Sequence, residues 1–125
     1  MEQMAKKILI VEDHKDSRDV LVALLQFSGY RITEAGNGLQ ALEKARSEKP
    51  DLIVMDLQLP GMMGIEAAKI LKEEESTAHI PIIAYTALLN ETLKEEALKV
   101  GMKSFIDKPA SVKLIKETIQ KYILP

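Results

Sequence analysis

The chain has 125 residues, of which 46% are hydrophobic, and this is enough for one domain with a buried core. A net charge of −2 with both signs spread along the chain, and an aromatic content of only 4%, argue against direct nucleic-acid binding. Cysteine is absent, which excludes disulfides and thiolate metal sites, and no apolar run approaches the roughly 20 residues that span a bilayer. We therefore expect a cytoplasmic protein without a membrane segment, with residues 1–125 forming one domain and an ordered core over about 7–124.

The first half of the chain alternates short apolar runs with segments of helical period. Strands are predicted at 7–12, 31–35 and 51–56, and helices at 15–28 and 39–48. The first helix ends at Gly29, and its inward-facing candidates are Val20, Leu21, Leu24, Leu25 and Phe27. Runs as apolar as those at 8–11 and 52–55 are typical of strands that are buried on both faces of a parallel sheet.

The second half continues the alternation. Helices are predicted at 65–75, 88–100 and 111–124, and strands at 81–86 and 103–107, with Ser111 as a candidate N-cap. Five strand–helix units in series predict an α/β fold, with right-handed crossovers and helices on both faces of a parallel sheet.

Charged side chains follow three of these strands. Glu12 and Asp13 come directly after the first strand, Asp56 ends the third, and Lys108 follows the fifth. Ligand sites of open α/β sheets lie outside the carboxyl ends of the strands, so we expect these four groups to share one crevice. Three carboxylates suit Mg²⁺, which prefers oxygen ligands and often shares its shell with phosphate.

Asp56 is the best nucleophile candidate, because it follows the most apolar strand and precedes a loop. A carboxylate can attack a phosphoryl donor and form an acyl phosphate. Such a transfer needs positioning and charge neutralisation, which Lys108 and Mg²⁺ would supply from two sides. The hydroxyl of Thr86 could hydrogen-bond a phosphoryl oxygen. Phe105 fits either core packing or a side chain that moves between buried and exposed positions.

Four motifs resemble the response-regulator receiver domain, the CheY-like family. They are ILIVED (8–13), DLIVMDLQLPGMMG (51–64), PIIAYTA (81–87) and DKPAS (107–111). The resemblance covers essentially the whole chain, and it implies a flavodoxin-like (βα)5 three-layer sandwich with a parallel sheet of order 2-1-3-4-5. Among single-domain members, the stretch 65–87 looks most like cell-cycle regulators of the DivK type.

The resemblance also implies roles for the acidic residues. Asp56 would be the phosphoacceptor, taking its phosphoryl group from a phosphohistidine on a histidine kinase or a histidine phosphotransfer protein. Glu12, Asp13 and Asp56 would surround Mg²⁺, with Glu12 acting through water. The backbone carbonyl of Gln58 would be a further ligand.

The switch residues follow from the same resemblance. Thr86 and Lys108 would bind the phosphoryl group, and Phe105 would be the aromatic residue that moves inward with the threonine. The surface formed by 88–100, 103–107 and 111–124 would then bind a downstream protein, with the chain a monomer or a weak phosphorylation-dependent dimer. Leu88 would place an apolar side chain near the path of attacking water, which predicts slow autodephosphorylation.

Other interpretations remain open at this stage. The lack of a following effector domain favours a stand-alone regulator, but a receiver excised from a hybrid histidine kinase would have the same chemistry. A small phosphohydrolase could use Asp56 as a covalent nucleophile, although Gln58 stands where a second acid would be expected. A flavodoxin-like FMN module is disfavoured by the acidic crevice.

Overall fold

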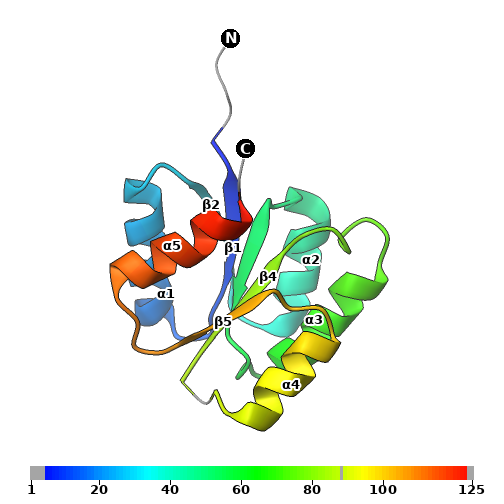
Figure 1. Ribbon diagram of the computed structural model, residues 1–125. Coiled ribbons are helices and arrows are strands. Elements are labelled where there is room, and N and C mark those ends of the chain that lie inside the picture. The colour runs from blue at the N-terminus through cyan, green and yellow to red at the C-terminus, as the bar shows by residue number, and fades with distance from the viewer. Residues whose placement is uncertain (1–4, 88, 124–125) are drawn as a thin grey trace.

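The computed structural model describes residues 5–87 and 89–123. Within these residues it contains five strands and five helices in strict alternation (Figure 1). The strands are β1 (Lys7–Val11), β2 (Arg31–Ala35), β3 (Leu52–Met55), β4 (Ile82–Thr86) and β5 (Ser104–Asp107). The helices are α1 (Lys15–Phe27), α2 (Gly38–Glu48), α3 (Gly64–Glu73), α4 (Glu91–Lys99) and α5 (Val112–Tyr122).

The strands form one parallel sheet in the order β2-β1-β3-β4-β5. Helices α1 and α5 cover one face of the sheet, and α2, α3 and α4 cover the other (Figure 1). The predicted flavodoxin-like three-layer sandwich and its strand order are therefore confirmed. Among the described residues no helix combines the length and apolar character needed to cross a membrane.

The central strands β1 and β3 are apolar on both faces because each face meets a helix layer. Leu9 and Ile53 belong to the core under α2, α3 and α4, whereas Ile10 and Val54 belong to the core under α1 and α5. All four side chains are at most 1% exposed. Burying such a side chain stabilises the fold by about 1.5–3 kcal/mol, so these two strands anchor the sheet edge where the charged residues lie.

The inward face of α1 differs from the prediction. Leu21 and Leu25 are buried as expected, and Val22 is buried with them, but Val20 is 62% exposed and Phe27 is 93% exposed. Successive residues on an α-helix are about 100° apart, so a stripe through Leu21 and Leu25 turns Val20 and Phe27 toward solvent.

The largest boundary difference is at α4, which the sequence predicts from residue 88 and which begins at Glu91. Asn90 is its N-cap, with a side-chain oxygen that accepts a 2.9 Å hydrogen bond from the Leu93 N–H. An Asn cap satisfies an amide that would otherwise lack a partner, and this sets the first turn. Ser111 caps α5 in the same way, as predicted, by accepting from the Leu114 N–H.

Candidate functional site

The carboxyl ends of β1, β3 and β5 bring Glu12, Asp56 and Lys108 to the same edge of the sheet. Hydrogen bonds of the sheet continue into these residues and fix their backbones. The Glu12 N–H donates to the last carbonyl of β2, the Asp56 N–H to Val11, and the Lys108 N–H to Thr86, each at 3.0 Å. The predicted convergence of these charges is therefore present, and it is anchored by the sheet itself.

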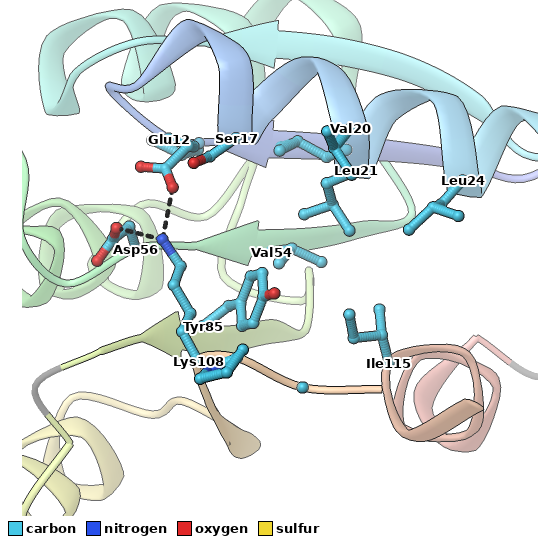
Figure 2. Close-up of a pocket in the computed structure, with 14 residues that line it drawn as sticks. Glu12, Ser17, Val20, Leu21, Leu24, Val54, Asp56, Tyr85, Lys108 and Ile115 are labelled. Atoms are coloured by element: carbon cyan, nitrogen blue, oxygen red, sulfur yellow. Dashed lines mark hydrogen bonds and ion pairs between the residues drawn. The ribbon is translucent and has the colours of Figure 1, made fainter. Parts of the chain in front are cut away.

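Lys108 joins the two buried carboxylates (Figure 2). Its Nζ donates to Asp56 Oδ2 at 2.8 Å and to Glu12 Oε1 at 2.5 Å. Asp56 is 7% exposed and Glu12 is 5% exposed. Burial lowers the pKa of Lys108, but hydrogen bonds to Asp56 and Glu12 and their negative charges outweigh it, so the pKa lies above its ordinary value of 10.5. The lysine is thus held as a cation between two acids.

The second oxygen of the Asp56 carboxylate is also held. Oδ1 accepts a 3.0 Å hydrogen bond from the Gln58 N–H, so both carboxylate oxygens have donors. Gln58 lines an open cleft of about 390 Å³ together with Asp13 and Asp56, and its side chain is exposed. Gln58 therefore lies where the sequence places it, beside the acids.

An acidic cluster with an unpartnered oxygen lies beside this ion pair. One ligand atom each of Glu12, Asp13 and His14 fall within 4.8 Å of one another. Glu12 Oε2 is buried and has no hydrogen-bond partner among the residues that the structure describes. A buried carboxylate oxygen without a donor is costly, and a cation of the Mg²⁺ type would satisfy it. The residues present therefore fit a divalent cation.

Thr86 ends β4, and Phe105 lies on the neighbouring strand β5, where it is paired with Ala84. Thr86 is fully buried, and its hydroxyl oxygen has no hydrogen-bond partner in the described part of the chain. Phe105 is half-buried and packs against the core under α2, α3 and α4. Leu88, on which the expectation of slow autodephosphorylation rests, lies outside the described residues.

A mostly apolar groove of about 340 Å³ extends from Lys108 between α1 and α5 (Figure 2). Val20 and Leu24 line it from α1, and Ile115 lines it from α5. The ring of Tyr85 lies beside the lysine, with the Lys108 Nζ 5.1 Å from the ring centroid. Such a contact adds to the stabilisation of the cation.

Sequence reasoning missed Tyr85 and His14. Tyr85 precedes Thr86 on β4, so strand alternation was the signal that it faces the opposite layer. The side chain of His14 is 76% exposed. Its position directly after Glu12 and Asp13 was the signal that it could join the acids.

A parallel five-stranded sheet with an acidic cluster and a lysine at its carboxyl edge defines a receiver-type signalling domain. The chain belongs to the response regulator receiver domain family, whose model matches residues 8–120. It is therefore a phosphorylation-switched signalling receiver, and the phosphohydrolase and FMN interpretations are not favoured. Members of this family work with histidine kinases or histidine phosphotransfer proteins.

Individual relatives agree with this assignment. The chain is 41% identical to the polar-differentiation response regulator DivK of Brucella anthropi and to that of Brucella ovis, in both cases over 96% of this chain and 98% of the relative. The resemblance to the DivK type is thereby confirmed.

Solved structures agree as well. The chemotaxis protein CheY4 of Vibrio cholerae matches with a TM-score of 0.90 at 29% identity, over 94% of this chain and 98% of that one. The receiver domain of the sensor histidine kinase PA1611 of Pseudomonas aeruginosa matches with a TM-score of 0.88 at 33% identity, over 95% and 98%. That receiver has a magnesium ion coordinated in its active-site cleft.

Proposed function

We propose that Asp56 is the phosphoacceptor of this receiver and takes its phosphoryl group from a phosphohistidine on a partner protein. The observation that carries the proposal is the position of the Asp56 carboxylate. It lies at the end of a fully buried central strand, it is paired with Lys108, and it shares a cleft with Asp13 and Gln58. On this proposal, a nucleophile, a fixed cation and a candidate metal site share one crevice.

The proposed metal is Mg²⁺, held by Glu12, Asp13 and Asp56 and by the backbone carbonyl of Gln58. The support is the unpartnered Glu12 Oε2 in the acidic cluster and the magnesium of the PA1611 receiver. A bound Mg²⁺ would neutralise charge on the phosphoryl oxygens.

In the transfer step a carboxylate oxygen of Asp56 forms a bond to phosphorus as the phosphorus–nitrogen bond of the donor breaks. The leaving imidazole nitrogen keeps the electron pair of the broken bond. Lys108, already 2.8 Å from Asp56 Oδ2, pairs with an oxygen of the new phosphoryl group. The Thr86 hydroxyl donates to another oxygen and so gains a partner, which it lacks among the described residues.

The rearrangement of Thr86 would reach the surface through Phe105. As the hydroxyl turns toward the phosphoryl group, Phe105 would move further inward and alter the surface formed by α4, β5 and α5. A downstream protein would bind that surface. We propose that the chain acts as a single receiver unit, as a monomer or a weak phosphorylation-dependent dimer.

This function is not that of an enzyme with a separate substrate, because the chain would catalyse only its own phosphorylation and dephosphorylation. A receiver within a hybrid histidine kinase would use the same residues. The proposal therefore holds for a stand-alone receiver and for one within such a kinase. The cytoplasmic location expected from the sequence stays a prediction.

The test is the intact mass of the protein after incubation with acetyl phosphate, with and without Mg²⁺. We expect the wild type to gain one phosphoryl group only when Mg²⁺ is present, and Asp56→Asn to gain none. Asp19→Asn is the matched control, because Asp19 lies on the exposed surface of α1, paired with Lys15, and this variant should still be modified. A modified Asp56→Asn, or a wild type that binds Mg²⁺ and stays unmodified, would contradict the proposal.

A further inference from the structure

His14 occupies the N-cap position of α1 without capping the helix. The N-cap side chains Asn37, Asn90 and Ser111 each accept a hydrogen bond from an amide of the following turn, but the His14 side chain makes no such bond. A residue of the Asn, Asp or Ser type at this position would stabilise the helix by capping it. The imidazole lies against the acidic residues instead.

The distances suit ligands of one ion. His14 Nδ1 lies 3.2 Å from Asp13 Oδ1 and 3.8 Å from Glu12 Oε2. With metal–ligand distances of about 2.1 Å, neighbouring ligands are about 3.0 Å apart in an octahedral shell and about 3.4 Å apart in a tetrahedral one. Only small side-chain movements would therefore bring the three groups onto a common ion.

An independent observation marks this place as a ligand site. Glu12 is 5% exposed, and the oxygen that faces His14 is the one without a hydrogen-bond partner among the described residues. The imidazole also lines the cleft that contains Asp13, Asp56 and Gln58. A cation seated against Glu12 Oε2 would thus lie close to the His14 imidazole.

We propose that His14 is a nitrogen ligand of the cation site and makes the site bind a first-row transition-metal ion of the Zn²⁺ type more tightly than Mg²⁺. Mg²⁺ prefers oxygen ligands, whereas imidazole favours ions such as Zn²⁺ and Ni²⁺. An imidazole with two carboxylates is a mixed set of the kind that Zn²⁺ accepts, with open positions for water or a phosphoryl oxygen. The inference rests on the proposed function, because the same acids form the site.

The test compares Zn²⁺ and Mg²⁺ binding to the full chain by isothermal titration calorimetry. The chain has no cysteine and only one other histidine, His79, so few other groups compete for Zn²⁺. We expect His14→Asn to weaken Zn²⁺ binding at least tenfold and to change Mg²⁺ binding less than twofold. His79→Asn is the matched control and should leave Zn²⁺ affinity unchanged, because His79 lies exposed on the segment between α3 and β4.

A second measurement on the wild type needs no variant. On addition of Zn²⁺, the imidazole NMR signals of His14 should shift while those of His79 stay in place. Equal Zn²⁺ affinity in His14→Asn and the wild type, or an equal loss in both histidine variants, would overturn the inference. A wild type that is phosphorylated at Asp56 in the presence of Mg²⁺ separates this failure from a failure of the proposed function, in which Asp56 stays unmodified.

Discussion

At the scale of single residues, the pairing of Lys108 with Asp56 and Glu12 dominates the site. Removing one partner of a buried ion pair leaves uncompensated charge and is strongly destabilising. Here the lysine side chain is 21% exposed, so water can reach the two acids and reduce the cost. We therefore expect Lys108→Met to lose about 2–3 kcal/mol of unfolding free energy without metal, measured by urea denaturation.

The matched control is Lys113→Met. The Lys113 side chain is 84% exposed, and its Nζ lies 3.9 Å from Glu117 Oε1. A surface pair of this kind contributes little, so the change should stay below about 0.5 kcal/mol. Equal losses in the two variants would contradict the electrostatic role of Lys108.

The pH dependence of this effect follows from the direction of the lysine shift. The pKa of Lys108 is higher in the folded protein than its ordinary value of 10.5. The pair therefore stabilises the fold fully below that ordinary value and loses its contribution only as pH rises through the higher folded pKa. The difference between the wild type and Lys108→Met should be constant from about pH 7 to about pH 9.

The sequence predicted which residues meet at the site, because strand ends of a parallel sheet share one edge. It did not predict that Lys108 bonds both Asp56 and Glu12, nor that the His14 imidazole lies against Asp13. Those facts depend on side-chain rotamers, which neighbouring groups select after the backbone is in place.

At the scale of elements, the contact between α3 and the end of β3 is the tightest constraint near the site. A Cβ added at Gly64 would collide with the Asp56 carbonyl oxygen and lie 2.8 Å from Leu57 Cα. The obstacle is backbone, so either α3 or the segment carrying Asp56 must shift. We expect Gly64→Ala to cost about 2 kcal/mol of stability by overpacking, even though Ala favours helix.

The same shift should slow phosphorylation of Asp56 by acetyl phosphate, measured as the initial rate of mass gain. Gly36→Ala is the matched control, because its added Cβ would meet only the side-chain ends of Arg18 and Gln40, at 3.4 and 3.5 Å. It should change stability by no more than about 0.5 kcal/mol. A Gly64→Ala protein as stable and as reactive as this control would show that α3 can move away without affecting Asp56.

The elements themselves were largely predictable, since apolar runs alternate with helical periods along the whole chain. The errors have local causes. On α1, Val20 and Phe27 were assigned to the core because they are apolar, yet the stripe through Leu21 and Leu25 leaves them outside. At α4 the prediction began too early because it did not weigh Asn90 as a cap.

At the scale of the whole molecule, the helix layers are anchored unequally. Helix α3 buries four residues, Gly64, Ala67, Ala68 and Leu71, whereas α4 buries only Ala97. Strand β5 is an edge strand with Ile106 as its one fully buried residue. Rearranging α4 and the edge strand β5 therefore disrupts less packing than moving the other helices on that face of the sheet, α2 and α3.

The hydrogen bonds of the site limit how far phosphorylation can drive this rearrangement. Moving an equilibrium from 1:99 to 99:1 needs about 5.5 kcal/mol. Lys108 already pairs with Asp56 before phosphorylation, so it contributes little new energy. In the proposed mechanism the Thr86 hydroxyl gains a partner, and a hydrogen bond to a charged group is worth about 1.5–3 kcal/mol. If 1% of the unphosphorylated protein is in the active form, that gain raises the active fraction to roughly 10–60%.

We therefore expect phosphorylation alone to switch the protein incompletely, with partner binding completing the change. Hydrogen exchange during steady phosphorylation by acetyl phosphate and Mg²⁺ should alter the protection of amides in α4 and β5, and leave α2 unchanged. Thr86→Ala should still be phosphorylated but should lose most of the change in α4, because the alanine has no hydroxyl to donate. A change of equal size in Thr86→Ala would mean that Thr86 does not drive the switch. Complete conversion of the free wild type would show that the site supplies more energy than one new hydrogen bond.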